Sequence, residues 1–173
     1  MAMTGEQYKR LVAAYVAKNF RDRGVEVFTE TKVGKSIIGK DRTVDVFVVA
    51  GSDALAIECK SQNVEGTTDE KIPYALADLE AMRIPGVLVY AGDGFSDGIV
   101  QMLRAHPLAA YCEPTAATLA RDPKLTLELD VVLAQTFRWW DLLKTPDRRF
   151  DLQVWEKTRD AAEGGSGKKK NKG

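Results

Sequence analysis

Three charged residues interrupt two segments that otherwise have the composition of buried strands. The segments are residues 43–49 and 54–62, and they carry Asp45 in the first and Glu58 and Lys60 in the second. Glu58 and Lys60 are two residues apart, so on a strand they project from the same face, while their apolar neighbours point to the other face. Charged side chains at such positions indicate a site of chemistry.

A short turn between the two segments predicts that they pair as a hairpin. Gly51, Ser52 and Asp53 supply turn-forming residues there, and the hairpin would bring Asp45 near the Glu58 end of its partner strand. Two carboxylates that face water on one side suit Mg²⁺, which takes one or two carboxylates together with phosphate oxygens of a substrate. A bound metal ion lowers the pKa of a coordinated water, and a neighbouring ammonium group can stabilise the developing negative charge. The natural substrate is therefore a phosphodiester.

This arrangement of Asp45 followed by Glu58-x-Lys60 resembles the active-site signature of the PD-(D/E)XK nuclease superfamily, which has the restriction-endonuclease-like fold. The resemblance implies a core of helix, three-stranded meander, helix and strand, and the chain can be read in that order from about residue 4 to residue 90. It also implies that Asp45 and Glu58 bind Mg²⁺, for which Mn²⁺ can substitute, and that Lys60 assists the attacking water. The sequence departs from the family pattern at Val44, where many members have proline.

The same resemblance extends to two further residues. Gln62, two positions after the lysine, resembles an extension found in some restriction-like members, where it would contact DNA or an active-site water. Glu6 is the candidate, by position, for the metal-binding or orienting Glu that some members carry on the first helix. Its helical position falls away from the apolar stripe, so it is equally a solvated first-turn acid that the helix dipole favours.

The alternative for the central cluster is a cross-strand ion cluster on the solvated face of a half-exposed sheet. A bare Glu-x-Lys pair recurs by chance in a chain with this many charged residues. The predicted order of helices and strands, together with Asp45 and the apolar flanks, favours the functional interpretation.

A basic loop precedes Asp45 and could reach the phosphate backbone of DNA. Its candidate contacts are Lys35, Lys40 and Arg42, although a run of charge on a hairpin is more often only solvated. Gly34-Lys35-Ser36 is not a P-loop, because the motif needs a glycine where Thr29 stands and a helix where the next strand is expected.

The apolar periodicity predicts the remaining elements. Helical spacing covers residues 4–20, 69–82, 96–105 and 131–143, while strands are expected at 25–29, 86–90 and 124–129. The unalternated apolar strand at 86–90 fits a buried parallel neighbour reached by a right-handed crossover. We therefore expect an α/β fold in αβββαβ order, with a mixed central sheet flanked by helices.

The length of 173 residues fits one ordinary domain. We expect this domain over residues 1–162, with a core at about 4–105 and a C-terminal extension at 106–162. Residues 163–173 are rich in glycine and lysine and are expected to form a disordered basic tail. In the extension, Trp139 and Trp140 either stack on bases or close a core or dimer interface, and the second interpretation is favoured.

Composition excludes several classes of protein. The 25 basic residues balance the 25 acidic ones, so any contact with nucleic acid comes from local patches. There is no apolar run of about 18 residues and no secretory leader, which predicts a cytoplasmic protein that does not contact a membrane. The two cysteines and the single histidine lack the spacing of a zinc site or a catalytic triad, so the thiols are expected to be buried and free.

The sequence thus predicts a Mg²⁺-dependent DNA endonuclease, restriction-like or involved in DNA processing. A homodimer is expected if both strands are cut, because two sites must reach opposite phosphates. The alternatives are a non-catalytic DNA-binding or assembly protein with the same fold, and a nuclease for branched DNA or RNA.

Overall fold

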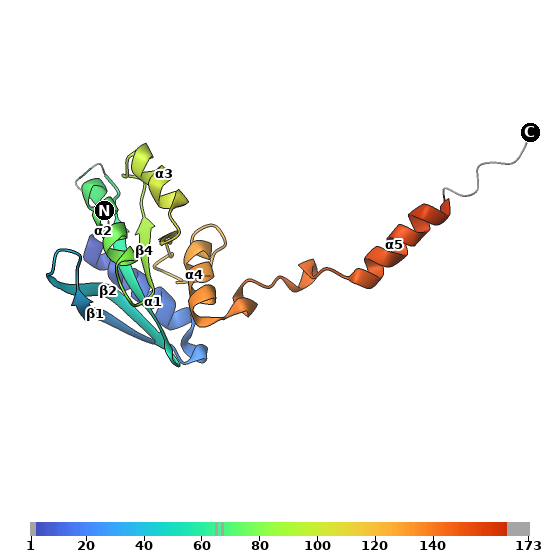
Figure 1. Ribbon diagram of the computed structural model, residues 1–173, viewed down its shortest axis with the longest axis horizontal. Helices are drawn as coiled ribbons and strands as arrows, with labels where there is room; N and C mark the ends of the chain where they lie inside the picture. The colour runs from blue at the N-terminus through green and yellow to red at the C-terminus, as the bar shows by residue number, and fades with distance from the viewer. Residues whose placement is uncertain (1–2, 65, 67, 166–173) are drawn as a thin grey trace, which may run out of the picture. The chain divides into compact units, whose positions relative to one another are not determined.

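The computed structural model describes residues 3–64, 66 and 68–165 of the protein (Figure 1). The chain divides into two compact units, Met1–Leu142 and Leu143–Gly173. The first unit contains the whole sheet and the candidate site residues, and the second contains the helix that ends the described chain.

A mixed five-stranded sheet forms the centre of the first unit. Its strands lie in the order β1-β2-β3-β4-β5; the pairs β1–β2 and β2–β3 are antiparallel, and the pairs β3–β4 and β4–β5 are parallel. The strands are β1 (Glu26–Lys35), β2 (Asp41–Ala50), β3 (Asp53–Ser61), β4 (Gly86–Ala91) and β5 (Ala109–Tyr111). The expected α/β class with a mixed sheet is therefore confirmed.

Helices cover both faces of this sheet. The helical segments of the first unit are α1 (Gly5–Asn19), η1 (Arg21–Arg23), α2 (Thr68–Glu80), α3 (Asp97–Ala105), α4 (Leu127–Phe137) and η2 (Trp140–Leu142). α1 begins at the expected capping box, in which the Thr4 and Gln7 side chains each accept from the other residue's backbone N–H.

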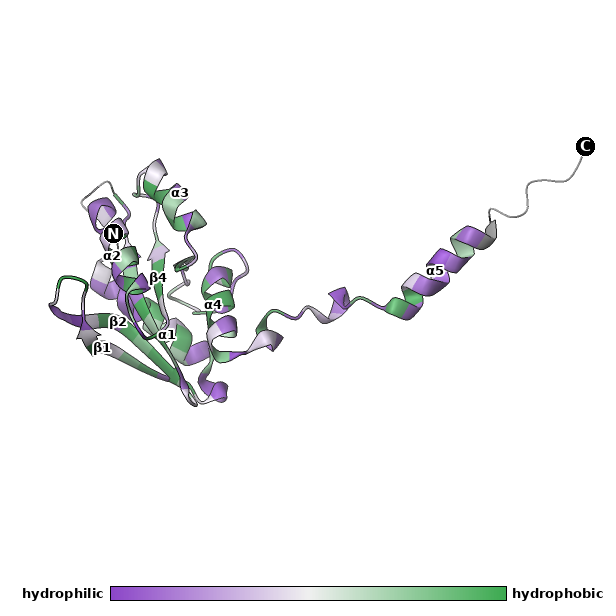
Figure 2. Cartoon of the chain, in the orientation of Figure 1, coloured by the Kyte–Doolittle hydropathy of each residue, from purple (hydrophilic) through white to green (hydrophobic). Residues whose placement is uncertain are grey.

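The side chains of β4 alternate between two apolar clusters, which shows that the sheet is buried on both faces. Val87 and Val89 pack with α1 and α4, while Leu88 and Tyr90 pack with α2 and α3. Figure 2 shows the apolar character of β2 and β4 that this burial requires. A strand buried on both faces explains the unalternated apolar sequence at 86–90.

The prediction of a strand at residues 124–129 is wrong. Residues 122–126 form a turn in which Thr126 Oγ1 accepts from the Asp122 N–H at 3.0 Å, and α4 begins at Leu127. Leu129 and Leu133 are buried at helical spacing, whereas Leu127 is 45% exposed. Leucines that alternate over so few residues are compatible with the period of a strand and with that of a helix. The spacing from Leu129 to Leu133 is helical and decides between the two.

Trp139 packs against the core of the first unit, and the two cysteines lie inside it. Trp139 stacks on Phe20 and Phe137, with ring centroids 5.5 and 4.7 Å apart, whereas Trp140 is half exposed. Cys59 and Cys112 are buried and free. Burial raises the pKa of both thiols well above the ordinary value, and the carboxylates of Asp45 and Glu58 add to this effect at Cys59.

The second unit contains η3 (Pro146–Arg148) and α5 (Leu152–Gly165). The tail expected from residue 163 thus begins inside α5, while residues 166–173 lie outside the described residues. Across the described chain, no helix combines the length and apolar character needed to cross a membrane.

Candidate active site

The register of β2 and β3 places Asp45 and Glu58 at the same level of the sheet. The last paired residues of these strands are Val46 and Ile57, and both belong to the apolar cluster under α1. Asp45 and Glu58 are the next residues along, so their side chains point to the opposite face. Lys60 follows Glu58 by two residues and shares that face.

Asp45 also terminates the ladder between the two strands. Its Oδ2 accepts a hydrogen bond from the backbone N–H of Cys59 at 2.8 Å, beyond the last residue pair. A side-chain carboxylate thus takes the place of a backbone acceptor where β2 and β3 separate. The contact fixes Asp45 against β3, and among the described residues its Oδ1 has no hydrogen-bond partner.

Glu58 and Lys60 form a close, half-buried ion pair. Lys60 Nζ lies 2.6 Å from Glu58 Oε1, and the two side chains are 21% and 20% exposed. Burial raises the pKa of the Glu58 carboxyl above its ordinary value, Lys60 and Arg42 oppose this rise, and the neighbouring Asp45 carboxylate adds to it. The site therefore holds a carboxylate whose charge is costly unless a cation is close.

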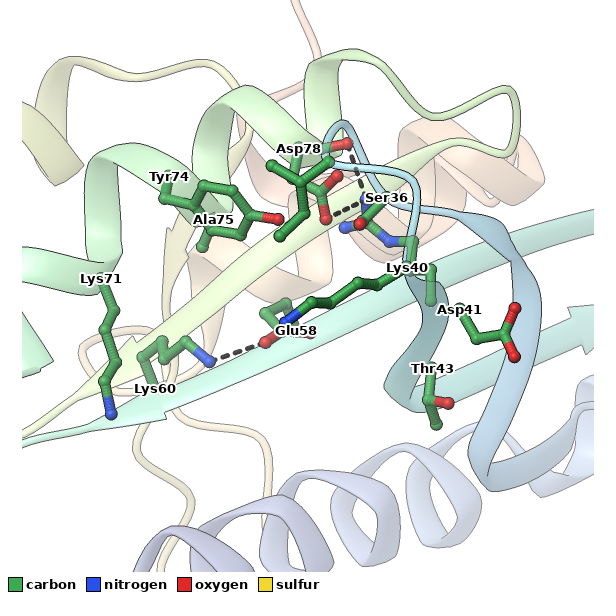
Figure 3. A pocket seen from close by; sticks show the side chains of 12 residues that line it. Ser36, Lys40, Asp41, Thr43, Glu58, Lys60, Lys71, Tyr74, Ala75 and Asp78 are labelled. Atoms are coloured by element: carbon green, nitrogen blue, oxygen red, sulfur yellow. Dashed lines mark hydrogen bonds and ion pairs between the residues drawn. The ribbon is translucent and has the colours of Figure 1, made fainter.

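Both residues of this pair line a cavity of about 340 Å³ that lies between the sheet and α2. Figure 3 shows Glu58 and Lys60 on the strand and Lys71, Tyr74, Ala75 and Asp78 on the helix above it. The tip of the β1–β2 hairpin forms another wall, with Ser36, Ile38, Lys40, Asp41, Arg42 and Thr43. The Glu58–Lys60 pair thus opens into a recess between the strand, α2 and the hairpin.

Asp78 of α2 holds the hairpin over this cavity. Its Oδ1 accepts from the backbone N–H of Ile37 at 2.9 Å, and its carboxylate forms an ion pair with Arg42. Arg42 Nη1 also donates to the backbone carbonyl of Asp78 at 2.7 Å. The side chains of Arg42 and Asp78 are 7% and 10% exposed, so this clamp is buried.

Gln62 lies in a junction of loops and does not line the cavity that Glu58 and Lys60 share. Its Nε2 donates to Asp69 Oδ1 at 3.0 Å and to the carbonyl of Gly94 at 2.7 Å. Its Oε1 accepts from the N–H of Thr68 at 3.1 Å. The amide therefore joins the end of β3 to the start of α2 and to the loop after β4, and its predicted role at the substrate stays a prediction.

Glu6 does not join Asp45 and Glu58. Its side chain is 61% exposed and forms ion pairs with Lys9, at 2.5 Å, and with Arg10, at 3.3 Å. The hydrogen bond from Lys9 lowers the pKa of Glu6. Lys9 also pairs with Glu30 of β1, so the contacts of Glu6 are with charged residues of α1 and, through Lys9, with β1.

The three basic residues expected to contact DNA have different surroundings. Lys35 is exposed and paired with Asp41 at 2.5 Å, whereas Arg42 is buried in the clamp with Asp78. Lys40 is exposed and lines the cavity. The structure therefore brings Lys40 and Arg42, but not Lys35, to the space that Glu58 and Lys60 share.

The donor set fits a hard divalent cation. Asp45 and Glu58 offer carboxylate oxygens, and each keeps one oxygen that accepts no hydrogen bond from the described residues. Within residues 3–64, 66 and 68–165, no three His, Cys, Asp or Glu side chains gather as a ready-made metal centre. Two carboxylates match Mg²⁺, which keeps water and substrate oxygens in its remaining positions.

Comparison with known families decides how this cluster is classified. A family model of the PD-(D/E)XK nuclease superfamily domain matches residues 4–140, well over half of the chain. The chain belongs to the PD-(D/E)XK nuclease superfamily. Members of this superfamily are generally nucleases and typically use divalent metal ions. The resemblance drawn from Asp45, Glu58 and Lys60 is thereby confirmed at the level of the family.

Other comparisons are less informative. The crystal structure of a protein of unknown function, AF1548, aligns with a TM-score of 0.42 and 17% identity. That alignment covers 58% of this PD-(D/E)XK chain and 56% of the other chain. No curated protein matches the sequence.

Sequence reasoning missed the contribution of α2 to this PD-(D/E)XK site. Lys71, Tyr74 and Asp78 all line the cavity, although their positions on the helix alone do not tell what they face. One signal was available: Asp78 is a charged residue beside the buried Leu79, on a helix whose other inward residues are apolar. A buried acid on an apolar face indicates a specific partner, which the structure identifies as Arg42.

Proposed function

We propose that the protein is a metal-dependent deoxyribonuclease that hydrolyses phosphodiester bonds, in which Asp45 and Glu58 hold Mg²⁺ and Lys60 assists the attacking water. The observation that carries the proposal is the convergence of these three side chains on one face of the sheet, at the point where β2 and β3 separate. Membership of the PD-(D/E)XK superfamily supports the same chemistry.

Each residue has a distinct role in this proposal. When bound, the metal ion would supply a water of lowered pKa and neutralise charge on the phosphate. Asp45 is oriented by the Cys59 N–H, which leaves its other oxygen for the ion. Glu58 is desolvated, so its charge gains from a nearby cation. Lys60 is held beside Glu58, where its ammonium group would stabilise negative charge on the reacting phosphate.

DNA is the proposed substrate, with Lys40 as a candidate contact to its backbone. Lys40 is exposed at the hairpin tip and lines the same cavity as Glu58 and Lys60. Two copies of the chain would be needed to cut both strands at once, because each copy carries one such cluster. We therefore propose a homodimer for double-strand cleavage.

The test is cleavage of supercoiled plasmid and of linear, single-stranded and branched DNA and RNA, in Mg²⁺, in Mn²⁺ and in EDTA. The decisive variant is Lys60→Met, with Lys124→Met as its control, because Lys124 is an exposed lysine in the loop before α4. We expect cleavage only with metal, and a loss of about 10²–10³-fold in Lys60→Met alone. The substrate that is cut fastest identifies the preferred nucleic acid.

Absence of metal-dependent cleavage on every substrate, with DNA binding intact, would overturn the proposal in favour of a non-catalytic DNA-binding protein of the same fold. Cleavage that survives in the double variant Asp45→Asn, Glu58→Gln would overturn the assigned site. A homodimer would be supported if the rate of double-strand cleavage depended on protein concentration while the rate of nicking did not.

A further inference from the structure

The cavity beside Glu58 contains two buried polar groups with no acceptor from the described residues. They are Arg42 Nε and Ser36 Oγ, and both residues line the same cavity. Arg42 is only 7% exposed, and its clamp to Asp78 uses Nη1, which leaves the Nε–H without a partner. A buried donor without an acceptor is destabilising, so two such groups in one cavity point to a ligand that accepts hydrogen bonds.

The charges that remain free in this cavity are positive. Each acidic residue of its lining is already paired: Asp41 with Lys35, Glu58 with Lys60, and Asp78 with Arg42. Lys40 and Lys71 also line the cavity, and neither ammonium group forms an ion pair with the described residues. An anion would therefore meet two free cations and two free donors.

The size and position of the cavity narrow the choice of anion. Its volume of about 340 Å³ is roughly ten times that of one water in the liquid, so it admits a phosphate together with part of a sugar. Glu58 and Lys60 share its lining, and the charge of Arg42 acts on Glu58. The anion would thus lie next to the position proposed for cleavage. Guanidinium groups suit phosphate oxygens, because their N–H donors are arranged in a fixed fork.

We propose that Ser36, Lys40, Arg42 and Lys71 form a subsite for a second phosphate of the nucleic-acid strand, next to the phosphate that is cut. The subsite rests on the proposed nuclease function, since that function supplies the strand. Its ligand is either an internal phosphodiester or a terminal phosphate, which share the chemistry that the cavity recognises. The clamp from Asp78 keeps the hairpin, and with it Ser36 and Arg42, over the cavity.

The Nε–H of Arg42 provides a direct readout, because it gives its own signal in a ¹H–¹⁵N spectrum. The signal is assigned by its loss in Arg42→Lys. The wild-type protein is titrated, in EDTA, with inorganic phosphate, with the dinucleotide dTpdT, and with dTpdT that carries a 5′-phosphate. We expect the Arg42 signal to move with both dinucleotides. Tighter binding of the 5′-phosphorylated form by about tenfold identifies a terminal phosphate, and equal binding identifies an internal one.

Matched variants connect the signal to the subsite. Ser36→Ala and Lys71→Gln should each weaken dinucleotide binding by several-fold. Ser61→Ala is the control for the first, because Ser61 also has a buried hydroxyl without a partner but does not line the cavity. Lys124→Gln is the control for the second. Ser36→Ala should melt no lower than the wild type, since it removes an unpaired polar group, which separates weaker binding from loss of fold.

Three outcomes would overturn the subsite: no movement of the Arg42 signal with any ligand, movement with inorganic phosphate alone, or equal weakening in the variants and their controls. None of these readouts needs metal or cleavage. Failure here with cleavage intact therefore removes only the subsite, and movement of Arg42 without any cleavage removes only the proposed nuclease function.

Discussion

Asp45 Oδ2 accepts the backbone N–H of Cys59 at 2.8 Å, so the residue proposed to bind metal also completes the pairing of β2 with β3. One oxygen of this carboxylate thus has a structural role, and the other is the oxygen proposed to bind the metal ion. This division explains how a charged residue is accommodated within β2 where its pairing with β3 ends, because part of its desolvation is offset by a backbone donor.

Variants of Asp45 should separate its two roles. Asp45→Asn keeps an oxygen that can accept from Cys59, so its free energy of unfolding in urea should stay close to that of the wild type. Asp45→Ala leaves the N–H unpaired and should lose about 1–3 kcal/mol. Both variants should lose metal-dependent cleavage. Equal stability of the two variants would contradict the structural role of the Cys59 contact.

Glu58→Gln should stabilise the fold at neutral pH in the absence of metal. Burial raises the pKa of Glu58 in the folded protein above its ordinary value of 4.5. Folding therefore favours the protonated form of Glu58. The stability that this form contributes is fully present below the pKa of Glu58 in the unfolded chain, and it is lost as pH rises through the pKa in the folded protein. Glutamine mimics the protonated form and avoids this loss.

The measurement is the difference in melting temperature between Glu58→Gln and the wild type from pH 4 to pH 8 in EDTA. We expect the difference to grow with pH over the acidic range and then to level off. Added Mg²⁺ should raise the melting temperature of the wild type more than that of the variant, because a ligand that binds only the folded state stabilises it. A difference independent of pH would contradict the raised pKa.

Asp78→Ala should destabilise the protein by about 3–5 kcal/mol, because it leaves the buried Arg42 charge without its carboxylate. Asp78→Asn keeps an acceptor for the Ile37 N–H and should cost less. Hydrogen exchange measures the local effect: the Ile37 amide should exchange much faster in Asp78→Ala, while amides of β4 should change only with global stability. Unchanged exchange at Ile37 would show that the hairpin tip does not depend on this clamp.

Gln62→Ala tests whether the glutamine acts on the fold or on the substrate. Its three hydrogen bonds to Asp69, Gly94 and Thr68 predict a loss of about 1–3 kcal/mol in stability. Asn63→Ala is the control, because the one side-chain hydrogen bond that Asn63 makes with the described residues, to the Met3 carbonyl, is long at 3.4 Å. A normal melting temperature combined with a large loss of cleavage would instead support direct action on the substrate.

The central cluster could be predicted from sequence because local rules determine it. The two-residue period of a strand places Glu58 and Lys60 together, and the turn after Ala50 brings Asp45 beside them. The helices at 4–20 and 69–82 followed in the same way from apolar spacing, and the observed α1 and α2 lie within two residues of those limits at each end.

The walls of the cavity could not be predicted, because they depend on contacts between distant segments. The sequence around Asp78 does not indicate that the hairpin tip contacts α2. The contact joins Ile37 and Asp78, which are 41 residues apart in sequence. The alternation of leucines at residues 124–129 also led to a wrong prediction. Leu125, Leu127 and Leu129 fit a strand, and only the position of Leu133 shows that the segment is helical. Periodicity decides an element only when the segment is long enough to distinguish the two periods.

The burial of Cys59 and Cys112 has a practical consequence. Both thiols are buried, and burial raises their pKa values. Alkylating reagents should therefore not react with them in the native protein. A single cysteine introduced at the exposed Ile38 would then be the one reactive thiol at the hairpin tip. A fluorophore attached there would report when the hairpin moves on α2, without any change to the native cysteines.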